Sequence, residues 1–255
     1  MKNPQHILIT GASSGIGEAL ALFYAQKGVT LFLCAQNTER LSDVAKRCRE
    51  KRAEVFAEKV DVTDAAAMEN WISRCDKMAP LDLVIANAGV SAGPGKTGES
   101  SEMTRKIFAV NVNGVLNTVL PSLEKMSPRR RGQIAVLSSL AGYRGLPSAP
   151  AYSGSKNAVR AWGEALRGYI RPCGIEVNVV CPGFVVSRIT QKNKFPMPFL
   201  MPADKAALII AEGLRKNKGR ITFPPLLAFS AWIVSCLPSG IAEFILTKLP
   251  KKGAD

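Results

Sequence analysis

The chain has 255 residues, of which 47% are hydrophobic and 21% are charged, and this composition excludes a disordered, collagen-like or linker-like chain. It carries 34 Lys and Arg against 20 Asp and Glu, so its formal net charge of +14 favours anionic partners such as phosphates, a membrane or nucleic acid. The six cysteines are scattered without a CxxC pair and His6 is the only histidine, so we expect free thiols in a reducing cytosol and no metal site.

From residue 6 to about residue 171, short apolar runs alternate with longer segments of helical period. Strands are predicted at 6–10, 30–34, 54–57, 81–86, 133–137 and 176–180, and helices near 15–27, 38–51, 64–78, 101–120 and 152–171. Strands this apolar are typically buried on both faces. With right-handed crossovers they predict an α/β fold, a doubly wound parallel sheet of the Rossmann type with helices on both faces.

The alternation ends after residue 180. Residues 184–203 are predicted to form a loop, and a helix near 204–216 and a strand at 220–223 complete a domain over 1–223. Residues 224–255 form an apolar and basic tail, which predicts a C-terminal helical appendage. Because residues 1–5 lead directly into the first apolar run, we expect no secretory signal and a cytoplasmic location.

A glycine-rich turn, Thr10-Gly11-Ala12-Ser13-Ser14-Gly15-Ile16-Gly17, lies between the first predicted strand and the first predicted helix. Glycines let backbone N–H groups approach a pyrophosphate closely, and the N-terminus of the helix adds positive potential at the same point. A strand before the turn and a helix after it are the context that dinucleotide binding requires. The alternative is a glycine-rich turn without a ligand.

Tyr152 and Lys156 lie four residues apart and share one face of their predicted helix. A neighbouring ammonium favours the phenolate, so we expect Lys156 to lower the pKa of Tyr152 from about 10 toward the working pH. Ser139 lies thirteen residues before Tyr152, just after the fifth strand, where its hydroxyl can hydrogen-bond a carbonyl oxygen. Ser138 is a weaker candidate, because the thirteen-residue spacing selects Ser139.

The chain resembles the short-chain dehydrogenase/reductase family over about residues 5–190. The glycine turn fits the family's TGxxxGIG motif at every fixed position, and Ala86-Asn87-Ala88-Gly89 is similar to its NNAG motif, with Ala86 in place of the first Asn. The resemblance implies Asn111 as a fourth catalytic residue beside Ser139, Tyr152 and Lys156.

The resemblance also implies the residues that hold a nicotinamide dinucleotide. Asp61 and Val62 match the adenine contact after the third strand, and the segment from Pro182 to Ser187 matches the one beside the nicotinamide, with Ser187 for the family's Thr. The expected cofactor contacts are Gly11, Ser13, Ser14, Gly15, Ile16, Gly17, Gln36, Asn37, Arg40, Asp61, Val62, Asn87, Ala88, Gly89, Tyr152, Lys156, Pro182, Gly183, Val185 and Ser187.

The activity implied by the resemblance is the interconversion of a carbonyl and an alcohol. Hydride passes from the nicotinamide to the carbonyl carbon, Tyr152 exchanges the proton, Lys156 holds the nicotinamide ribose, and Ser139 orients the substrate. Two alternatives stay open. One is a catalytically silent cofactor-binding sensor or membrane-docked scaffold, and the other is a nucleotide-sugar epimerase or dehydratase of the same fold.

The end of the second strand bears on the choice of cofactor. Gln36 stands where relatives that use NAD carry Asp, and no acidic residue there repels a 2′-phosphate. Ser14, Gln36 and Asn37 can hydrogen-bond a phosphate, and Arg40 can reach it. We therefore expect NADP(H) to be favoured over NAD(H).

In the family the segment 184–203 is the substrate lid. Its cations are interleaved with large apolar groups, which predicts a hydrophobic small-molecule substrate, with packing in the core or at a subunit interface as the alternative. Relatives are commonly dimers or tetramers through the helices near 101–120 and 152–171, so a homo-oligomer is expected. The triplet at 129–131 lies in a predicted loop without any nucleic-acid-binding module, so no nucleic acid is expected.

The tail contains two apolar stretches, Leu226–Leu237 and Ile241–Leu249, each shorter than the ~20 residues that a membrane-spanning helix needs. They predict two short helices that rest peripherally on an anionic membrane, at its inner face, with Trp232 and Phe244 buried. The cations expected to meet lipid headgroups are Lys216, Lys218, Arg220, Lys248, Lys251 and Lys252. The alternative is that the tail closes the substrate pocket and forms an oligomer interface.

Overall fold

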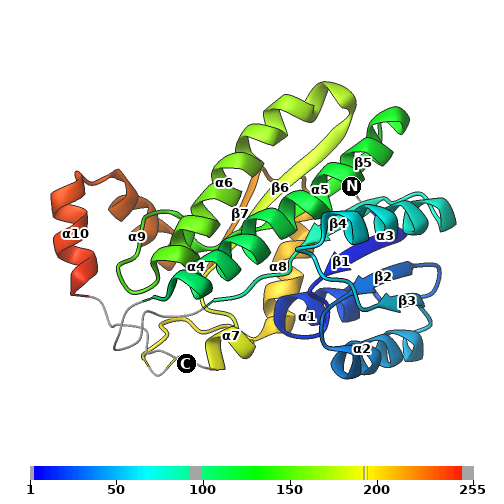
Figure 1. The fold of residues 1–255 in the computed structure, drawn as a ribbon, viewed down its shortest axis with the longest axis horizontal. Helices are drawn as coiled ribbons and strands as arrows, with labels where there is room; N and C mark the ends of the chain where they lie inside the picture. Colours follow the sequence, from blue (N-terminus) through cyan, green and yellow to red (C-terminus); the bar gives the residue numbers. More distant parts are fainter. Residues whose placement is uncertain (1–2, 92–98, 192, 194, 249–255) are drawn as a thin grey trace.

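The computed structural model describes residues 3–91, 99–191, 193 and 195–248 (Figure 1). Within them, seven parallel strands form one sheet in the order β3-β2-β1-β4-β5-β6-β7. The strands are β1 His6–Thr10, β2 Thr30–Cys34, β3 Glu54–Glu58, β4 Leu83–Ala86, β5 Gly132–Leu137, β6 Ile175–Pro182 and β7 Arg220–Phe223. The predicted doubly wound parallel sheet is confirmed.

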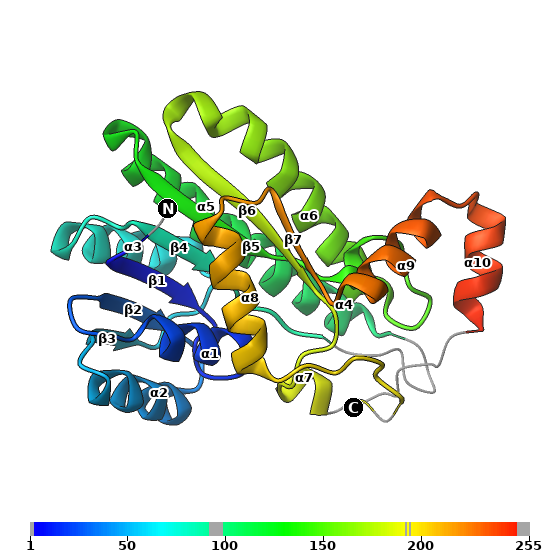
Figure 2. The ribbon, with the colours of Figure 1, turned by 180° about the vertical axis from the view of Figure 1, so that it is seen from behind.

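Helices cover both faces of the sheet (Figures 1 and 2). They are α1 Gly15–Tyr24, α2 Thr38–Glu50, α3 Ala65–Met78, α4 Ser101–Phe108, α5 Gly114–Met126, α6 Pro150–Ile170, α7 Arg188–Gln191, α8 Ala203–Arg215, α9 Pro225–Cys236 and α10 Ser239–Thr247. α1, α2 and α8 pack on one face, and α3, α5 and α6 on the other. The short α7 lies inside the segment predicted to be a loop.

Successive side chains of each strand enter the two halves of the core in turn, as the pleat of a strand requires. In β1, Ile7 and Ile9 join the cluster under α1, α2 and α8, whereas Leu8 joins the cluster under α3, α5 and α6. All three side chains are fully buried. Burial on both faces explains why the strands appear in the sequence as continuous apolar runs.

The helix predicted near 101–120 is interrupted. α4 ends at Phe108, residues Ala109–Asn113 form a π-helical turn, and α5 runs from Gly114 to Met126. Gly114 packs closely against the loop that follows β3. A Cβ at Gly114 would lie 2.7 Å from Val62 Cγ2. A π turn inserts one residue into a helix and is frequent at functional sites. Here it contains Asn111.

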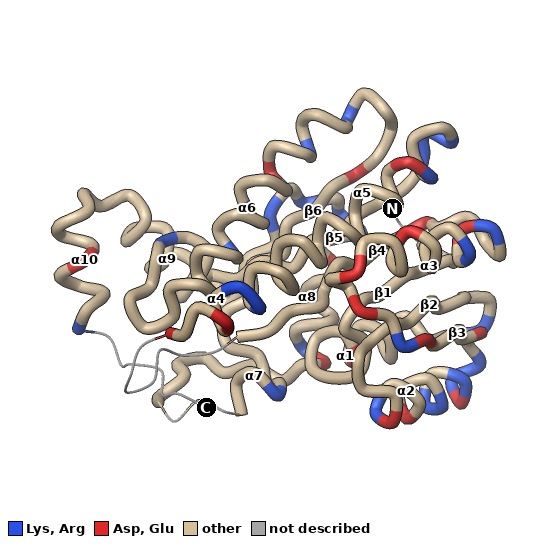
Figure 3. Tube along the Cα trace, viewed as in Figure 1, with Lys and Arg blue, Asp and Glu red and all other residues tan. Residues whose placement is uncertain are grey.

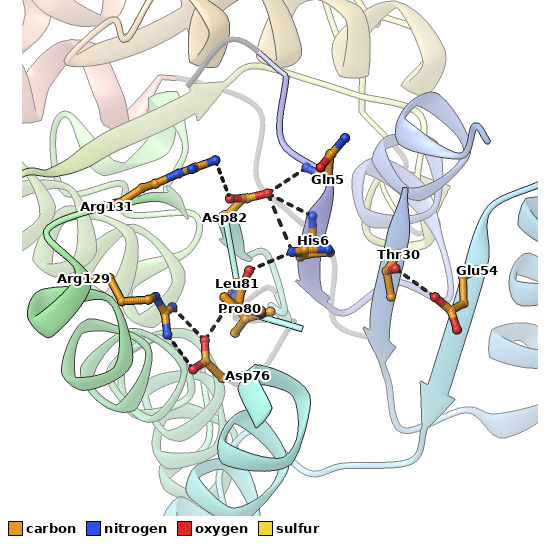
Figure 4. Close-up of polar contacts among 10 residues, drawn as sticks. All are labelled: Gln5, His6, Thr30, Glu54, Asp76, Pro80, Leu81, Asp82, Arg129 and Arg131. Atoms are coloured by element: carbon orange, nitrogen blue, oxygen red, sulfur yellow. Dashed lines mark hydrogen bonds and ion pairs between the residues drawn. The ribbon is translucent and has the colours of Figure 1, made fainter. Parts of the chain in front are cut away.

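A network of hydrogen bonds and ion pairs lies at the amino ends of the central strands (Figure 4). Asp82, just before β4, accepts hydrogen bonds from the backbone N–H groups of Gln5 at 2.9 Å and His6 at 3.2 Å, and an ion pair joins it to Arg131 at 3.2 Å. Arg129 pairs in a bidentate manner with Asp76, with both N···O distances 2.7 Å. Arg130 donates to the carbonyl of Pro172 at 2.8 Å, so all three members of the basic triplet at 129–131 have structural partners.

The tail forms the two predicted helices. α9 follows β7 and contacts both β7 and the 3-10 turn Leu140–Gly142, and α10 follows after Pro238 (Figure 1). None of the helices in the described residues is long and apolar enough to cross a membrane. The division of the chain after residue 223 stays a prediction.

Candidate active site

The carboxyl ends of the central strands meet at one edge of the sheet, where open α/β sheets bind their ligands. β1 ends at the glycine turn, β4 at Asn87, β5 at the pair of serines before the 3-10 turn, and β6 at Pro182. Ile16 follows the first of these turns and packs against the core, and Ala88 follows Asn87. The topology thus gathers most of the predicted site residues from distant parts of the chain.

The glycine turn is held in a conformation that its glycines make possible. Gly11 and Gly15 have φ of +66° and +59°, in the left-handed region that favours glycine. A Cβ at Gly17 would meet the carbonyl oxygen of Gly11 and lie 2.5 Å from Nδ2 of Asn87. Asn87 Nδ2 in turn donates to the carbonyl of Thr10 at 2.9 Å. The resulting close approach at the N-terminus of α1 fits a dinucleotide pyrophosphate.

Asn111 connects the π turn to the two segments around it. Its Nδ2 donates to the carbonyl of Val90 and to Ser155 Oγ, both at 3.0 Å, and its Oδ1 accepts from the N–H of Val90 at 2.8 Å. A Cβ at Gly89 would lie 3.3 Å from both Asn111 Oδ1 and Lys156 Nζ. Gly89, Asn111 and Lys156 therefore meet at one point, where there is little room for a side chain at position 89.

Ser139 and Tyr152 lie together, as the thirteen-residue spacing predicts. A hydrogen bond joins their side chains, and Ser139 Oγ also accepts from the N–H of Ala141 at 3.1 Å. The hydroxyl of Ser138 is engaged elsewhere, because it donates to the carbonyl of Lys156 at 2.7 Å. Of the two neighbouring serines, only Ser139 is bonded to the phenol.

The pKa of Tyr152 shifts in the opposite direction to the prediction. Burial raises the pKa of Tyr152, and the hydrogen bond with Ser139 opposes that shift. Burial also lowers the pKa of Lys156 to about 8, and its Nζ donates to the carbonyl of Leu137 at 2.8 Å. Burial therefore sets the direction of the Tyr152 pKa shift, and the expectation that Lys156 lowers this pKa stays a prediction.

The residues after β2, which were expected to contact the cofactor, differ from one another in exposure and in hydrogen bonding. Gln36 is exposed, and Asn37 Oδ1 accepts from the N–H of Arg40 at 2.9 Å, so the Asn37 side chain caps α2. Arg40 lines a cavity of about 640 Å³ together with Ser13 and Ser14, and its buried Nε has no hydrogen-bond partner in the described part of the chain. Ser14 makes no side-chain capping bond to α1.

The predicted adenine contact lies in the loop after β3. Asp61 Oδ1 accepts from the N–H and the hydroxyl of Thr63 at 2.9 and 2.8 Å, and Asp61 remains exposed. The carbonyl of Val62 accepts from Asn117 Nδ2 at 2.9 Å. Both residues therefore belong to a turn that packs against α5.

The segment after β6 lies against the glycine turn. Gly183 donates its N–H to the carbonyl of Phe223 at 2.7 Å, and Val185 forms a parallel bridge with Met201. A Cβ at Gly15 would lie 2.9 Å from Ser187 Cβ. The expected pyrophosphate and nicotinamide segments are thus direct neighbours.

A cavity of about 790 Å³ opens beside Ser139 and Tyr152. Its other walls come from the loop before α6, the lid and the tail, with mostly apolar side chains such as Phe184, Phe195 and Leu227. From α9 and α10 the lining residues are Leu227, Ser230, Ala231, Val234, Ile245 and Leu246. This volume is within the range of pockets that hold small molecules.

Several residues of the site carry no signal in the sequence. Val90 and Ser155 hold Asn111, the Leu137 carbonyl receives Lys156, and Arg144 lines the cavity. Backbone groups and cavity walls are set by packing, which motif spacing does not report. The sequence indicates Gly89, Asn111 and Lys156 separately, but not that they lie together at one crowded point.

Comparison with known proteins places the chain among oxidoreductases. A family model described as short chain dehydrogenase matches residues 5–196. A protein of Myxococcus xanthus (strain DK1622), described as an uncharacterized oxidoreductase, is 36% identical over 243 residues, which cover 95% of this chain and 96% of that protein.

Solved structures agree with the fold. A variant of actinorhodin polyketide ketoreductase with NADPH has 26% identity and a TM-score of 0.78, covering 87% of this chain and 96% of that one. A short chain dehydrogenase/reductase from Burkholderia phymatum in complex with NAD has 23% identity and a TM-score of 0.84, covering 100% and 99%. The two similar folds thus hold different nicotinamide cofactors.

Proposed function

The chain belongs to the short-chain dehydrogenase family and is an NAD(P)-dependent oxidoreductase acting on CH–OH groups, and from this premise we propose that it reduces a hydrophobic ketone or aldehyde with NADPH. One observation carries the proposal. Ser139 and Tyr152, joined by a hydrogen bond, line a largely apolar cavity of about 790 Å³ at the carboxyl edge of the sheet.

The cofactor's place is the crevice between the glycine turn and the segment after β6. A Cβ at Gly17 would lie 2.5 Å from Asn87 Nδ2 and one at Gly89 would lie 3.3 Å from Asn111 Oδ1, so both positions favour glycine. The glycine turn holds the pyrophosphate, and Lys156 and Ser187 hold the nicotinamide end. When bound, the reduced nicotinamide supplies the hydride that the carbonyl carbon receives.

The chain's own residues handle the proton. Ser139 donates a hydrogen bond to the substrate's carbonyl oxygen, which fixes its orientation and stabilises the negative charge that develops there. Tyr152 is protonated because burial raises its pKa, and it gives that proton to the same oxygen. Lys156, with a pKa of about 8, returns a proton toward the phenolate, and Asn111 keeps its segment in place.

Preference for NADPH is supported by the cavity beside Ser13 and Ser14. Arg40 lines it with an unpaired buried Nε in the described chain, and no carboxylate stands at position 36. A 2′-phosphate would pair with that guanidinium. We expect NADPH to bind at least about tenfold more tightly than NADH, measured by fluorescence titration, and Arg40→Gln to reduce the difference. Equal affinities in the unaltered chain would contradict this preference.

The reaction is tested by NADPH oxidation with a panel of apolar ketones and aldehydes. We expect turnover in the unaltered chain and none detectable in Tyr152→Phe, whose NADPH affinity should be unchanged within about twofold. Binding of NADPH without turnover of any compound in the panel would favour the alternative, a silent sensor or scaffold.

A second proposal concerns the outer faces of α9 and α10. Leu226, Phe229, Trp232 and Phe244 are 61%, 58%, 51% and 62% exposed, although the opposite sides of the same helices line the cavity. Between residues 225 and 248 only Glu243 and Lys248 are charged. In Figure 3 the tube of α9 and α10 is accordingly almost entirely tan. We propose that these helices rest on an anionic membrane surface, so that an apolar substrate can enter the cavity from the lipid.

The headgroup contacts expected in the sequence need correction. Arg220 pairs with Glu164 at 2.7 Å and Lys216 pairs with Glu212 at 2.8 Å, so neither is a free cation. Lys248 lies over the ring of Phe244 at 3.8 Å. Lys251 and Lys252 lie outside the described residues. The proposed contact therefore depends more on apolar insertion than on charge.

We also propose a homo-oligomer through α4, α5 and α6, which lie side by side in both views (Figures 1 and 2). Phe108, Leu120 and Tyr169 on these helices are 40%, 49% and 81% exposed. Light scattering after gel filtration measures the assembly, and a monomer at micromolar concentration would contradict it.

A further inference from the structure

Arg144 is a charged residue in the wall of an otherwise uncharged cavity. Every other described residue that lines the cavity beside Ser139 and Tyr152 is apolar or neutral. Arg144 is half-buried and belongs to the loop between the 3-10 turn and α6. It therefore shares a cavity with the groups proposed to hold the substrate's carbonyl.

No carboxylate among the described residues neutralises this guanidinium. Arg144 Nη1 donates to the carbonyl of Ser235 at 3.4 Å, and no carboxylate in the described part of the chain pairs with it. Arg160 and Arg220 provide the comparison, because they flank the ring of Tyr143 in the same wall. Both pair with Glu164, at 3.3 and 2.7 Å.

An unpaired guanidinium beside apolar walls is unfavourable, because the charge is partly removed from water without a counter-ion. The group has five N–H donors in a planar fork, and the contact with Ser235 uses one of them. The remaining donors match the two oxygens of a carboxylate or phosphate.

We infer that the substrate is amphipathic, with an anionic carboxylate or phosphate that Arg144 binds and an apolar chain that separates this anion from the reacting carbonyl. This inference rests on the proposed reduction and names its substrate class. The carbonyl lies at Ser139 and Tyr152, and the chain lies along the apolar walls. The cavity therefore selects substrates in which the distance between the carbonyl and the anion matches the distance between these two sites.

A purely structural role makes a different prediction. Ser235 lies in the last turn of α9, whose carbonyls need donors, so an Arg144 with a purely structural role would only anchor that helix. Loss of an anchor would weaken neutral and anionic ligands alike. The ratio between matched ligands within one variant therefore separates the two roles.

The experiment uses ω-oxo fatty acids of increasing chain length, each with its methyl ester, as substrates for reduction with NADPH. In the unaltered chain we expect kcat/KM to favour the acid over its ester by about 10- to 100-fold at one best chain length. Arg144→Gln should bring this ratio close to one, and Arg144→Lys should restore part of it. The control Arg171→Gln removes the same charge at an exposed site and should keep the full ratio.

Binding is measured independently of turnover by calorimetry with decanoate, decyl phosphate and decanol. We expect the two anions to bind more tightly than decanol, with the preference lost in Arg144→Gln, and the tighter anion distinguishes a carboxylate from a phosphate. Reduction of acids and esters with the same ratio in the unaltered chain and Arg144→Gln would overturn the inference. A chain that turns over none of these aldehydes yet binds decanoate through Arg144 would instead overturn the proposed reduction.

Discussion

The neighbouring residues Ser138 and Ser139 have different hydrogen-bond partners, and we expect them to have different roles. The hydroxyl of Ser138 is used by the backbone of α6, whereas that of Ser139 is bonded to Tyr152 at the cavity. We expect Ser139→Ala to lower kcat by about 100- to 1000-fold, because it removes a donor to the developing negative charge. Steady-state NADPH oxidation measures the change.

Ser138→Ala is the matched control. It should lower the free energy of unfolding by about 1 kcal/mol through the lost hydrogen bond with the Lys156 carbonyl. Its kcat should stay within a few-fold of the unaltered enzyme. An equal loss of kcat in both variants would mean that the substrate is oriented by the segment as a whole and not by the Ser139 hydroxyl.

The buried Lys156 makes the free energy of unfolding depend on pH. Burial lowers its pKa from 10.5 to about 8, so between these values the unfolded chain holds a proton that the folded chain releases. Unfolding free energy therefore rises with pH across this window, and below about pH 8 the full cost of burying the ammonium is present.

Comparison with Lys156→Met isolates this contribution. From about pH 7.5 to about pH 9.5 the unaltered chain should gain about 2 kcal/mol relative to the variant, measured by urea unfolding. Other groups titrate in both proteins and cancel in the difference. A difference that is constant with pH would mean that Lys156 keeps its ordinary pKa in the folded state.

At the scale of elements, two helix glycines have opposite surroundings. Gly17 in α1 faces the Gly11 carbonyl and Asn87, whereas a Cβ at Gly168 in α6 meets nothing within 4 Å. We expect Gly17→Ala to push the turn from its position and weaken NADPH binding at least about tenfold. Gly168→Ala should stabilise the fold by about 0.5–1 kcal/mol with unchanged binding. Calorimetric titration and thermal unfolding measure both, and a normal NADPH affinity in Gly17→Ala would show that the turn can adjust.

Elements whose pattern is local could be predicted from sequence, and elements set by packing could not. The apolar runs and glycine turn identify the strands and the crevice, because each depends on residues close in sequence. The π turn at 109–113 adds one backbone residue without changing the residue types, so helical periodicity does not reveal it. It nevertheless positions Asn111 between Val90 and Ser155.

The sequence also does not determine the role of a side chain whose residue type suits two different positions. Asn37 caps α2 through the N–H of Arg40, and its expected contact with the cofactor stays a prediction. Asn is favoured at both kinds of position, so its type does not decide between them. The role of Arg144 in the cavity depends on α9, which begins eighty-one residues later in the chain. Only the folded chain brings them together.

At the scale of the whole molecule, charge and apolar surface are separated. Lys and Arg are spread over the Rossmann helices, while α9 and α10 at one end carry almost none (Figure 3). A net charge of +14 favours the approach to an anionic surface from any side. The exposed apolar side chains of the tail determine which side makes contact.

Salt separates these contributions, because it screens charge but leaves apolar insertion intact. We expect binding to anionic vesicles to persist largely at about 0.5 M NaCl, since Lys216 and Arg220 are already paired within the protein. Trp232→Glu and Phe244→Glu should each abolish it, because both side chains are more than half exposed at this end. Met78→Glu, equally exposed at the end of α3, is the control and should bind as the unaltered chain does. Co-sedimentation measures all four proteins. Binding that disappears in salt and is unaffected by Trp232→Glu would assign the contact to the basic surface and leave the tail as a wall of the cavity.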